Sequence, residues 1–252
     1  MKKHSWIRQL RTLYGLLVVL LFWYVLHLLI ETSAIPSPFA TIGNFIEIFP
    51  GELSIHLLVS FLRILVAIVI SLIAGTIIGL WIGMSKKADE LLSPIVYILY
   101  PLPKIAFLPI LMILFGLGNT PKIVLIITIV IFQIIVAVRD GVQEIPKELF
   151  YSVKSLGVNK LEMYRHLIMP SVLPKIITAI RISVGVSISV LFYGENFATT
   201  YGIGYFIMDS WIKVNYVEMF SGILALSIMG FVIFKVIDFI EFKVCGWIRI
   251  GK

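Results

Sequence analysis

The sequence predicts an all-α, polytopic membrane protein with about six transmembrane helices. Of its 252 residues, 60% are hydrophobic and 14% are charged, with a mean hydropathy of +1.03. A soluble domain is only about 45–50% apolar and about 25% charged, so an ordinary soluble protein and a disordered one are both excluded. The charges also separate apolar runs of about the length that crosses a bilayer. A single cysteine, Cys245, excludes an internal disulfide framework.

The first predicted span covers residues 12–30, a run without charge that follows a basic start. A secretory signal peptide is the alternative, since Ser37-Pro38-Phe39-Ala40 comes shortly afterwards. The apolar run is long for a signal peptide, which favours an uncleaved first span.

The remaining predicted spans cover residues 64–85, 91–121, 123–138, 176–194 and 219–240. The stretch 91–121 contains Pro94, Pro101, Pro103 and Pro109. As one straight helix it would be about 45 Å long, more than the ~30 Å of the hydrocarbon core. We therefore expect this span to tilt, kink or break at its prolines.

The connecting segments predict the orientation. Alternate segments on one side hold 15 of the 21 Lys and Arg residues. By the positive-inside rule, both termini lie in the cytoplasm and the chain crosses the cell (inner) membrane several times. The net charge of +7 then reflects topology, so no nucleic-acid partner is expected. Residues 1–53 form an N-terminal cytoplasmic segment, the first span and an external loop. Residues 54–247 form the transmembrane domain, and 248–252 a cytoplasmic tail.

The longest cytoplasmic segment, about 143–170, is amphipathic. Its apolar residues are spaced as in a pair of helices, with Gly157-Val158-Asn159 as the break between them and with Pro170 and Pro174 closing the segment before the fifth span. A helix on the membrane surface and a docking element for a soluble partner both fit this pattern.

Four motifs resemble one family of transporters. Gly157, Leu167 and Pro170 have the spacing of the Glu-Ala-Ala loop of ABC importer permeases, although Tyr151-Ser152-Val153 stands where that triplet would be. The others are Pro101-Leu-Pro-Lys-Ile-Ala-Phe-Leu-Pro109 with Phe115-Gly-Leu-Gly118, Ser60-Phe-Leu-Arg63, and Glu195 followed by Gly202-Ile-Gly204-Tyr205. The chain is therefore identified as a type I ABC importer permease of the nitrate/sulfonate/taurine-like branch.

This resemblance implies a non-enzymatic membrane subunit that forms the pathway for a small, anionic solute. It also implies a homodimer, two cytoplasmic ATPase subunits, an external solute-binding protein and a lipid bilayer. The sequence contains no phosphate-binding loop, so ATP is expected on the partner subunit and no cofactor on this chain. The predicted ATPase-coupling residues are Tyr151, Ser152, Val153, Gly157 and Pro170. An ion-coupled carrier or a channel that needs no ATPase remains the alternative.

Charged residues inside spans are costly, which makes them functional candidates. We expect the pathway or its gate to include Arg63, Lys104, Glu195, Asn196 and Thr199. Arg63 and Glu195 lie at the predicted outer ends of two spans, where they either pair or extend to the interface. Lys104 either extends in the same way or faces an aqueous cavity. Arg181, near the inner end of the fifth span, is expected to bind lipid phosphate or the coupling loop.

A stripe of small residues marks the second predicted span. Gly75, Gly79 and Gly83 recur every four residues, which allows another helix to approach closely. The partner helix belongs either to the same subunit or to a second copy. The four histidines are scattered at no ligand spacing, so no metal site is expected.

Overall fold

The computed structural model describes residues 2–249, with side chains from 13 to 247, and this part contains helices and no strand. The helices are α1 (Lys2–Ile30), α2 (Pro38–Ile48), α3 (Ser54–Met84), α4 (Lys86–Leu99), α5 (Leu108–Phe115), α6 (Asn119–Gln143), α7 (Lys147–Ser155), α8 (Lys160–Met163), α9 (Met169–Glu195), α10 (Ile203–Ile212) and α11 (Tyr216–Val244). Short 3₁₀ or π-helical turns cover Phe49–Leu53, Lys104–Phe107, Tyr164–Ile168 and Gly246–Arg249.

Five of the helical stretches are long and apolar enough to cross a membrane, and a sixth candidate is broken. The broken one consists of α4 and the stretch from Lys104 to Phe115, which meet at 80°. The break falls at residues 100–103, among the prolines that predicted it. The all-α fold with about six spans is confirmed.

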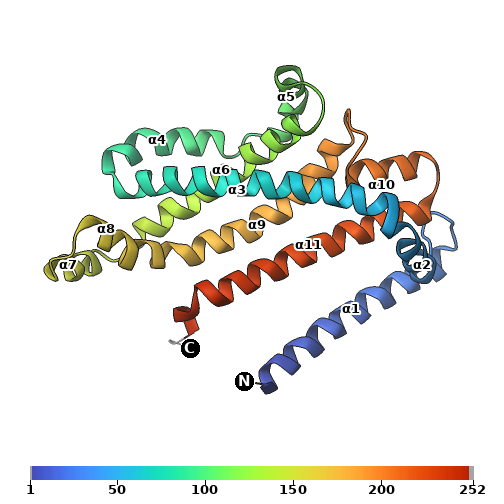
Figure 1. Ribbon diagram of the computed structural model, residues 1–252, viewed down its shortest axis with the longest axis horizontal. Coiled ribbons are helices and arrows are strands. Elements are labelled where there is room, and N and C mark those ends of the chain that lie inside the picture. Colours follow the sequence, from blue (N-terminus) through green and yellow to red (C-terminus); the bar gives the residue numbers. More distant parts are fainter. Residues whose placement is uncertain (1, 250–252) are drawn as a thin grey trace.

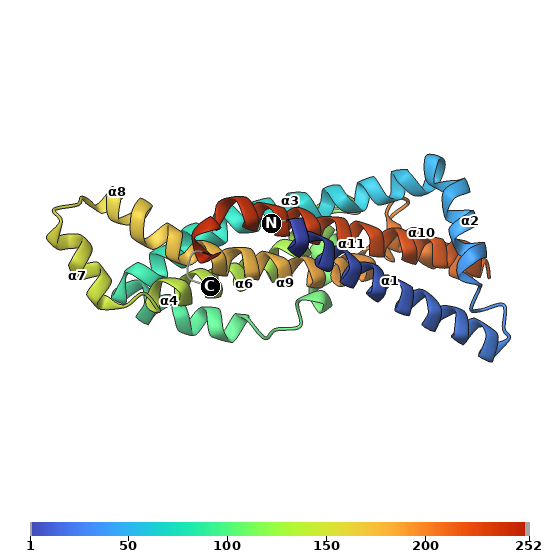
Figure 2. The ribbon, with the colours of Figure 1, turned by 90° about the horizontal axis from the view of Figure 1, so that it is seen from below.

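The bundle has two distinct ends (Figure 1). One end carries α7, α8 and the turn between α3 and α4, and we call it the α7 end. The other end carries α2, α10 and the loop 196–202, and we call it the α10 end. Seen from the second direction, α7 and α8 again project at the end opposite α2 and α10 (Figure 2). The basic residues Lys86, Lys87, Lys147, Lys154 and Lys160 therefore gather at the α7 end.

The core lies where α3, α6 and α9 pack together. Branched aliphatic side chains fill it, and Ile64 and Ala67 of α3, Ile134 and Val138 of α6 and Val172 of α9 are almost fully buried. The window of α6 that qualifies as a span is 44% buried, against 0% for α1. Because α6 is surrounded and α1 is not, α6 is the central helix of the subunit.

Helix α1 touches the rest of the chain mainly near its end. Trp23 stacks on Phe220 of α11 with ring centroids 5.5 Å apart, and its indole N–H donates to the carbonyl of Pro36 (3.1 Å). Towards its beginning α1 lies apart from the other helices (Figure 1). Its apolar side chains therefore face the surroundings of the subunit.

The start of the fifth span differs from the prediction. Pro170 and Pro174 do not end the preceding segment, because α8, the π-helical turn Tyr164–Ile168 and α9 form one helical stretch from Lys160 to Glu195. Pro170 lies in the first turn of α9 but inside this continuous stretch, so its missing N–H leaves one carbonyl of the preceding π-helical turn without a helical donor. The π-helical turn Tyr164–Ile168 lies just before Pro170 and interrupts the regular α-helical hydrogen bonding where α8 joins α9.

Candidate functional site

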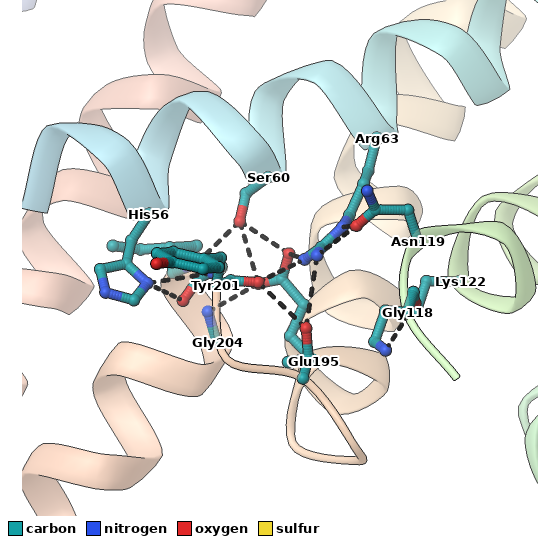
Figure 3. Close-up of polar contacts among 12 residues, drawn as sticks. His56, Ser60, Arg63, Gly118, Asn119, Lys122, Glu195, Tyr201 and Gly204 are labelled. Atoms are coloured by element: carbon teal, nitrogen blue, oxygen red, sulfur yellow. Dashed lines mark hydrogen bonds and ion pairs between the residues drawn. The ribbon is translucent and has the colours of Figure 1, made fainter.

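A buried polar cluster lies at the α10 end (Figure 3). Glu195, the last residue of α9, is fully buried. Its carboxylate accepts hydrogen bonds from Ser60 Oγ at 2.7 and 2.9 Å and from the Gly204 N–H at 2.8 Å. Arg63 Nη1 lies 2.5 Å from Glu195 Oε1 in an ion pair. The two charges thus pair with each other rather than extending to the interface. We call Ser60, Arg63, Glu195 and Gly204 the Glu195 cluster.

The guanidinium of Arg63 joins three parts of the chain. Its Nε and Nη2 both donate to Asn119 Oδ1 at the start of α6 (2.9 and 2.6 Å). Its Nη1 also donates to the carbonyl of Tyr201 (2.8 Å). Because the planar fork of Arg fixes the direction of each bond, this one side chain holds α3, α6 and the loop 196–202 in register.

Two glycines let the loop approach the buried carboxylate. Gly202 has a φ of +141°, and a Cβ there would collide with the carboxylate of Glu195. A Cβ on Gly204 would lie 2.7 Å from the carbonyl oxygen of Phe192. His56, buried one turn before Ser60, lies with Nδ1 3.0 Å from the Gly202 nitrogen. The Gly-Ile-Gly sequence is thus required by close packing.

A hollow of about 550 Å³ opens beside this loop. Its wall includes Arg63, Leu117, Gly118, Asn119, Thr199 and Thr200. Of the predicted gate residues, Arg63 and Thr199 therefore line the hollow. Asn196 caps α9 through its backbone N–H, which bonds the carbonyls of Gly194 and Tyr193. The loop does not continue as a solvated segment, because α10 follows it and buries Ile203, Phe206 and Ile207.

Lys104 lies at the break between α4 and α5. Its Nζ donates to the carbonyls of Leu99 (2.9 Å) and Tyr100 (2.7 Å), which end α4. The ammonium also lies 4.9 Å from the centroid of the Phe132 ring. It lines a second hollow, of about 300 Å³, together with Ser189 and Tyr193 of α9. The structure therefore places Lys104 in a hollow separate from that of Arg63.

The glycine stripe of α3 packs on α6 of the same chain. A Cβ on Gly75, Gly79 or Gly83 would lie 3.0, 2.7 or 2.8 Å from the Cβ of Ile134, Val138 or Val142, respectively. The contacts advance by four residues on both helices, so α3 and α6 run parallel and face to face. No side chain larger than hydrogen fits at these positions without a shift of the backbone.

The predicted coupling residues fall into two sets at the α7 end. Tyr151 and Ser152 are exposed on α7, whereas Val153 packs with Phe150 against the core. Gly157 follows α7 with a φ of +76° and has nothing within 4 Å of a built Cβ. Its glycine is therefore explained by a left-handed backbone conformation that reverses the chain, and not by close packing.

Sequence reasoning missed several residues that complete these sites. Asn119 and Lys122 were not singled out, and Ser60 was named only as part of a family motif, without a role. Lys122 is 1% exposed and its Nζ donates to the carbonyl of Gly118 (2.9 Å). One signal was present. His56, Ser60 and Arg63 are spaced i, i+4, i+7, which places three polar side chains on one face of an apolar helix.

Two arginines near the α7 end also form clusters. Arg139, 8% exposed, donates from Nη2 to the Tyr97 hydroxyl (2.7 Å) and from Nη1 to Ser93 Oγ (3.1 Å), which ties α6 to α4. Arg181 pairs with Asp238 (2.9 Å) and Glu241 (2.6 Å) of α11. Within the subunit, Arg181 therefore contacts two carboxylates in the last two turns of α11, while its expected contact with lipid phosphate or the coupling loop stays a prediction.

Residues 67–243 match the family described as binding-protein-dependent transport system inner membrane component. The chain belongs to this family. It is a multi-pass inner-membrane permease of the ABC importer type, and its position in the nitrate/sulfonate/taurine branch is confirmed by its relatives. The fold agrees with a solved structure of the MetNI methionine ABC transporter in an inward facing conformation, with a TM-score of 0.58, 22% identity, and coverage of 75% of this chain and 92% of that one.

Three relatives illustrate the branch. The taurine transport system permease protein TauC of Escherichia coli is 29% identical over 90% of this chain and 86% of its own length. The putative aliphatic sulfonates transport permease protein SsuC of Bacillus subtilis is 27% identical over 98% and 89%. The nitrate import permease protein NrtB of Synechococcus elongatus is 26% identical over 77% and 74%.

Proposed function

We propose that two copies of this permease form the translocation pathway of an ATP-driven importer for a small anionic solute. Two cytoplasmic ATPase subunits drive it, and an external binding protein delivers the solute. In this arrangement the α7 end and both termini lie in the cytoplasm, and the α10 end faces outward. The concentration of lysines at the α7 end supports this orientation.

The observation that carries the proposal is the exposed apolar surface of the α7 end. Leu149 and Tyr151 of α7 are 45% and 68% exposed, and Leu156 and Leu161 beside it are 78% and 73% exposed. Helices α7 and α8, which carry or adjoin these residues, project beyond the long apolar helices, where a soluble partner has access (Figure 1). Apolar groups gathered on a short projecting helix fit a groove on another protein.

Gly157 provides the test of this docking role. In a transporter reconstituted with its ATPase and binding protein, we expect Gly157→Val to reduce solute-stimulated ATP hydrolysis at least tenfold. A β-branched residue strongly disfavours the left-handed conformation that turns the chain after α7. The matched variant Gly157→Asn should keep most of the stimulation, since Asn tolerates that conformation.

Correct insertion of both variants can be checked with the single cysteine. Cys245 is 3% exposed, so a thiol-reactive dye should label the folded protein slowly. Normal coupling in a well-folded Gly157→Val permease would contradict the docking role. Solute uptake by vesicles that contain the permease and no ATPase would favour the ion-coupled carrier or channel instead.

The hollow at Lys104 supports the homodimer. Ile129, on its wall, lies ten residues into α6, about 15 Å from the start of that helix and thus well inside the bilayer. An ammonium and the hydroxyl-bearing side chains Ser189 and Tyr193 would be costly against lipid tails at this depth. A second copy that covers this face would enclose the hollow and let Lys104 attract an anion in the pathway.

The loop 196–202 is the proposed outer gate and landing surface. It contains Thr199, and it begins at Asn196, the residue that caps α9. The Glu195 cluster holds the two ends of this loop together, because Arg63 and the Gly204 N–H both bond the Glu195 carboxylate. The names of the relatives support taurine, another sulfonate or nitrate as the solute. Uptake of radiolabelled taurine and nitrate, each in competition with the other, would distinguish among them.

A further inference from the structure

The buried cation Arg63 lines the hollow at the α10 end. A second buried cation, Lys122, and the buried carboxylate of Glu195 each contact a residue of its wall, Gly118 and Arg63 respectively. Arg63 is 3% exposed, Lys122 is 1% exposed and Glu195 is 0% exposed. Lys122 lies within electrostatic range of both of the other groups. The three together carry one positive charge that no carboxylate of the cluster balances. An uncompensated charge in a buried site is costly, and a bound anion would relieve that cost.

Lys122 itself has unused hydrogen-bonding capacity. An ammonium has three N–H donors. Within the described part of the chain, the carbonyl of Gly118 is the acceptor that Nζ reaches, at 2.9 Å. Gly118 also forms part of the wall of the hollow. The ammonium therefore lies directly behind that wall, where its charge acts on whatever occupies the hollow.

The start of α6 lies at the wall of the hollow, to which Gly118 and Asn119 belong, and it adds backbone donors there, although Pro121 in its first turn has no N–H. Gly118 precedes the helix and provides no side-chain cap, so the first N–H groups of this 25-residue helix have no side-chain acceptor. The positive end of the helix dipole favours an anion there. Asn119 Oδ1 already accepts from Arg63, which leaves the amide N–H₂ of Asn119 as its free end.

Two carbonyls on the wall of the hollow already accept hydrogen bonds. The Gly118 carbonyl accepts from Lys122, and the Tyr201 carbonyl accepts from Arg63. Thr199 and Thr200 add hydroxyl groups to the wall. Thr199 Oγ1 donates to the Tyr201 carbonyl (3.2 Å), which would keep its bond from Arg63 if the hydroxyl turned to a ligand. The donors that the wall still offers, the Asn119 amide N–H₂ and the first N–H groups of α6, together with the positive charge, suit an oxyanion and disfavour a cation.

We propose that this hollow is a binding site for a small oxyanion, held by the start of α6 and by Thr199 between Arg63 and Lys122. Identifying this oxyanion with the transported solute rests on the proposed function, whereas the binding itself does not. At the α10 end the site would receive a sulfonate or nitrate group before it reaches the hollow at Lys104. The negative charge of the ligand would thus be balanced at entry.

The full-length permease, purified alone in phosphatidylcholine nanodiscs, allows binding to be measured without the ATPase or the binding protein. The readout is the thermal midpoint at which Cys245 becomes reactive to a thiol dye. We expect methanesulfonate and nitrate to raise this midpoint saturably. Dimethyl sulfone, which has the same shape as methanesulfonate but no charge, should have no effect.

Lys122→Met should weaken the apparent affinity for methanesulfonate about tenfold or more, because a charge-assisted contribution is lost. It should also raise the midpoint in anion-free buffer, since it removes the unbalanced charge. Lys213→Met is the matched control. Lys213 lies at the same end of the molecule but pairs with Asp209 (2.6 Å), so its loss should leave the affinity unchanged.

Thr199→Val provides an independent variant if Lys122→Met does not fold, and it should weaken binding several-fold. Equal effects of methanesulfonate and dimethyl sulfone, or unchanged affinity in the folded variants, would overturn the proposal. So would a midpoint that rises with phosphatidylglycerol in the nanodisc but not with methanesulfonate, because the ligand would then be a lipid headgroup. If the permease binds the anion but does not support ATP-driven transport, the anion site would be supported and the proposed function would be refuted.

Discussion

The ion pair of Arg63 and Glu195 should be strongly coupled, and a double-mutant cycle can measure the coupling. Glu195→Gln leaves the Arg63 guanidinium buried without its counter-ion. Arg63→Met leaves the Glu195 carboxylate with Ser60 and Gly204 alone. Removing one partner of a buried pair typically costs about 3–5 kcal/mol. For a chain of this size, about 1 kcal/mol shifts the midpoint by roughly 2–4 °C, so each variant should lose roughly 6–20 °C.

The double variant Arg63→Met/Glu195→Gln removes both charges and should lose clearly less than the sum of the two single losses. We expect a coupling energy of about 1.5 kcal/mol or more, in the range of groups in direct contact. The assay is thermal unfolding in nanodiscs, followed through the reactivity of Cys245. Single variants within about 2 °C of the parent, or strictly additive losses, would refute the assignment of this pair as a structural clamp.

Exchanging the two charges should not rescue the protein. The partners of Glu195 at Ser60 and Gly204 are donors, whereas those of Arg63 at Asn119 and Tyr201 are acceptors. An arginine at 195 and a glutamate at 63 would therefore each meet groups of the wrong kind. Recovery of transport in the exchanged variant would show that the attraction alone matters and that the surrounding hydrogen bonds do not.

Two further variants test packing elsewhere in the bundle. Gly79→Ala should destabilise the permease by about 1–3 kcal/mol, because its Cβ would meet Val138 and the Ile135 carbonyl at under 3.0 Å. Gly185→Ala, with nothing within 4 Å, should be neutral or stabilising by up to about 1 kcal/mol, and equal midpoints for the two would contradict the packing. Arg139→Lys should lower the free energy of unfolding by about 2 kcal/mol or more, because an ammonium cannot donate to Tyr97 and Ser93 at the same time. An unchanged thermal midpoint would show that the position of α4 does not depend on this contact.

The spans could be predicted from the sequence because the bilayer imposes a length and an apolar composition on each of them. The break at residues 100–103 was also predictable, since prolines at 101 and 103 remove backbone donors. The short helices α2 and α10 were not. They lie at the end of the bundle, where helices need not cross the membrane. Each is much shorter than a membrane span, so neither contains an apolar run of the length that identifies a span.

Only the charged residues of the candidate site could be predicted from the sequence. Arg63 and Glu195 stand out because charges inside spans are rare. Ser60, which bonds the same carboxylate, is 135 residues from Glu195, and a serine in an apolar helix gives no comparable signal. Lys122 was assigned to a connecting loop, because the predicted span began after it. The structure starts α6 at Asn119, four residues before the predicted span, and buries the side chain of Lys122.

The close contact between α3 and α6 determines how motion at the α7 end can travel. Only residues 144–146 separate α6 from α7, so a displacement of α7 acts directly on α6. The glycine stripe leaves no free space between α3 and α6, and Lys175 of α9 forms an ion pair with Glu144 just after α6. Helices α3, α6 and α9 should therefore move as one rigid body.

The α4–α5 pair is the part of the subunit with freedom to respond. Its two halves meet at 80°, and Ile113 and Leu114 of α5 are 83% and 68% exposed. Close-packed interfaces switch between discrete arrangements instead of deforming gradually. If two copies pair as proposed, a displacement of α7 should change the face that bears Lys104, between the rigid body of one copy and the α4–α5 pair of the other. It should not rearrange the Glu195 cluster.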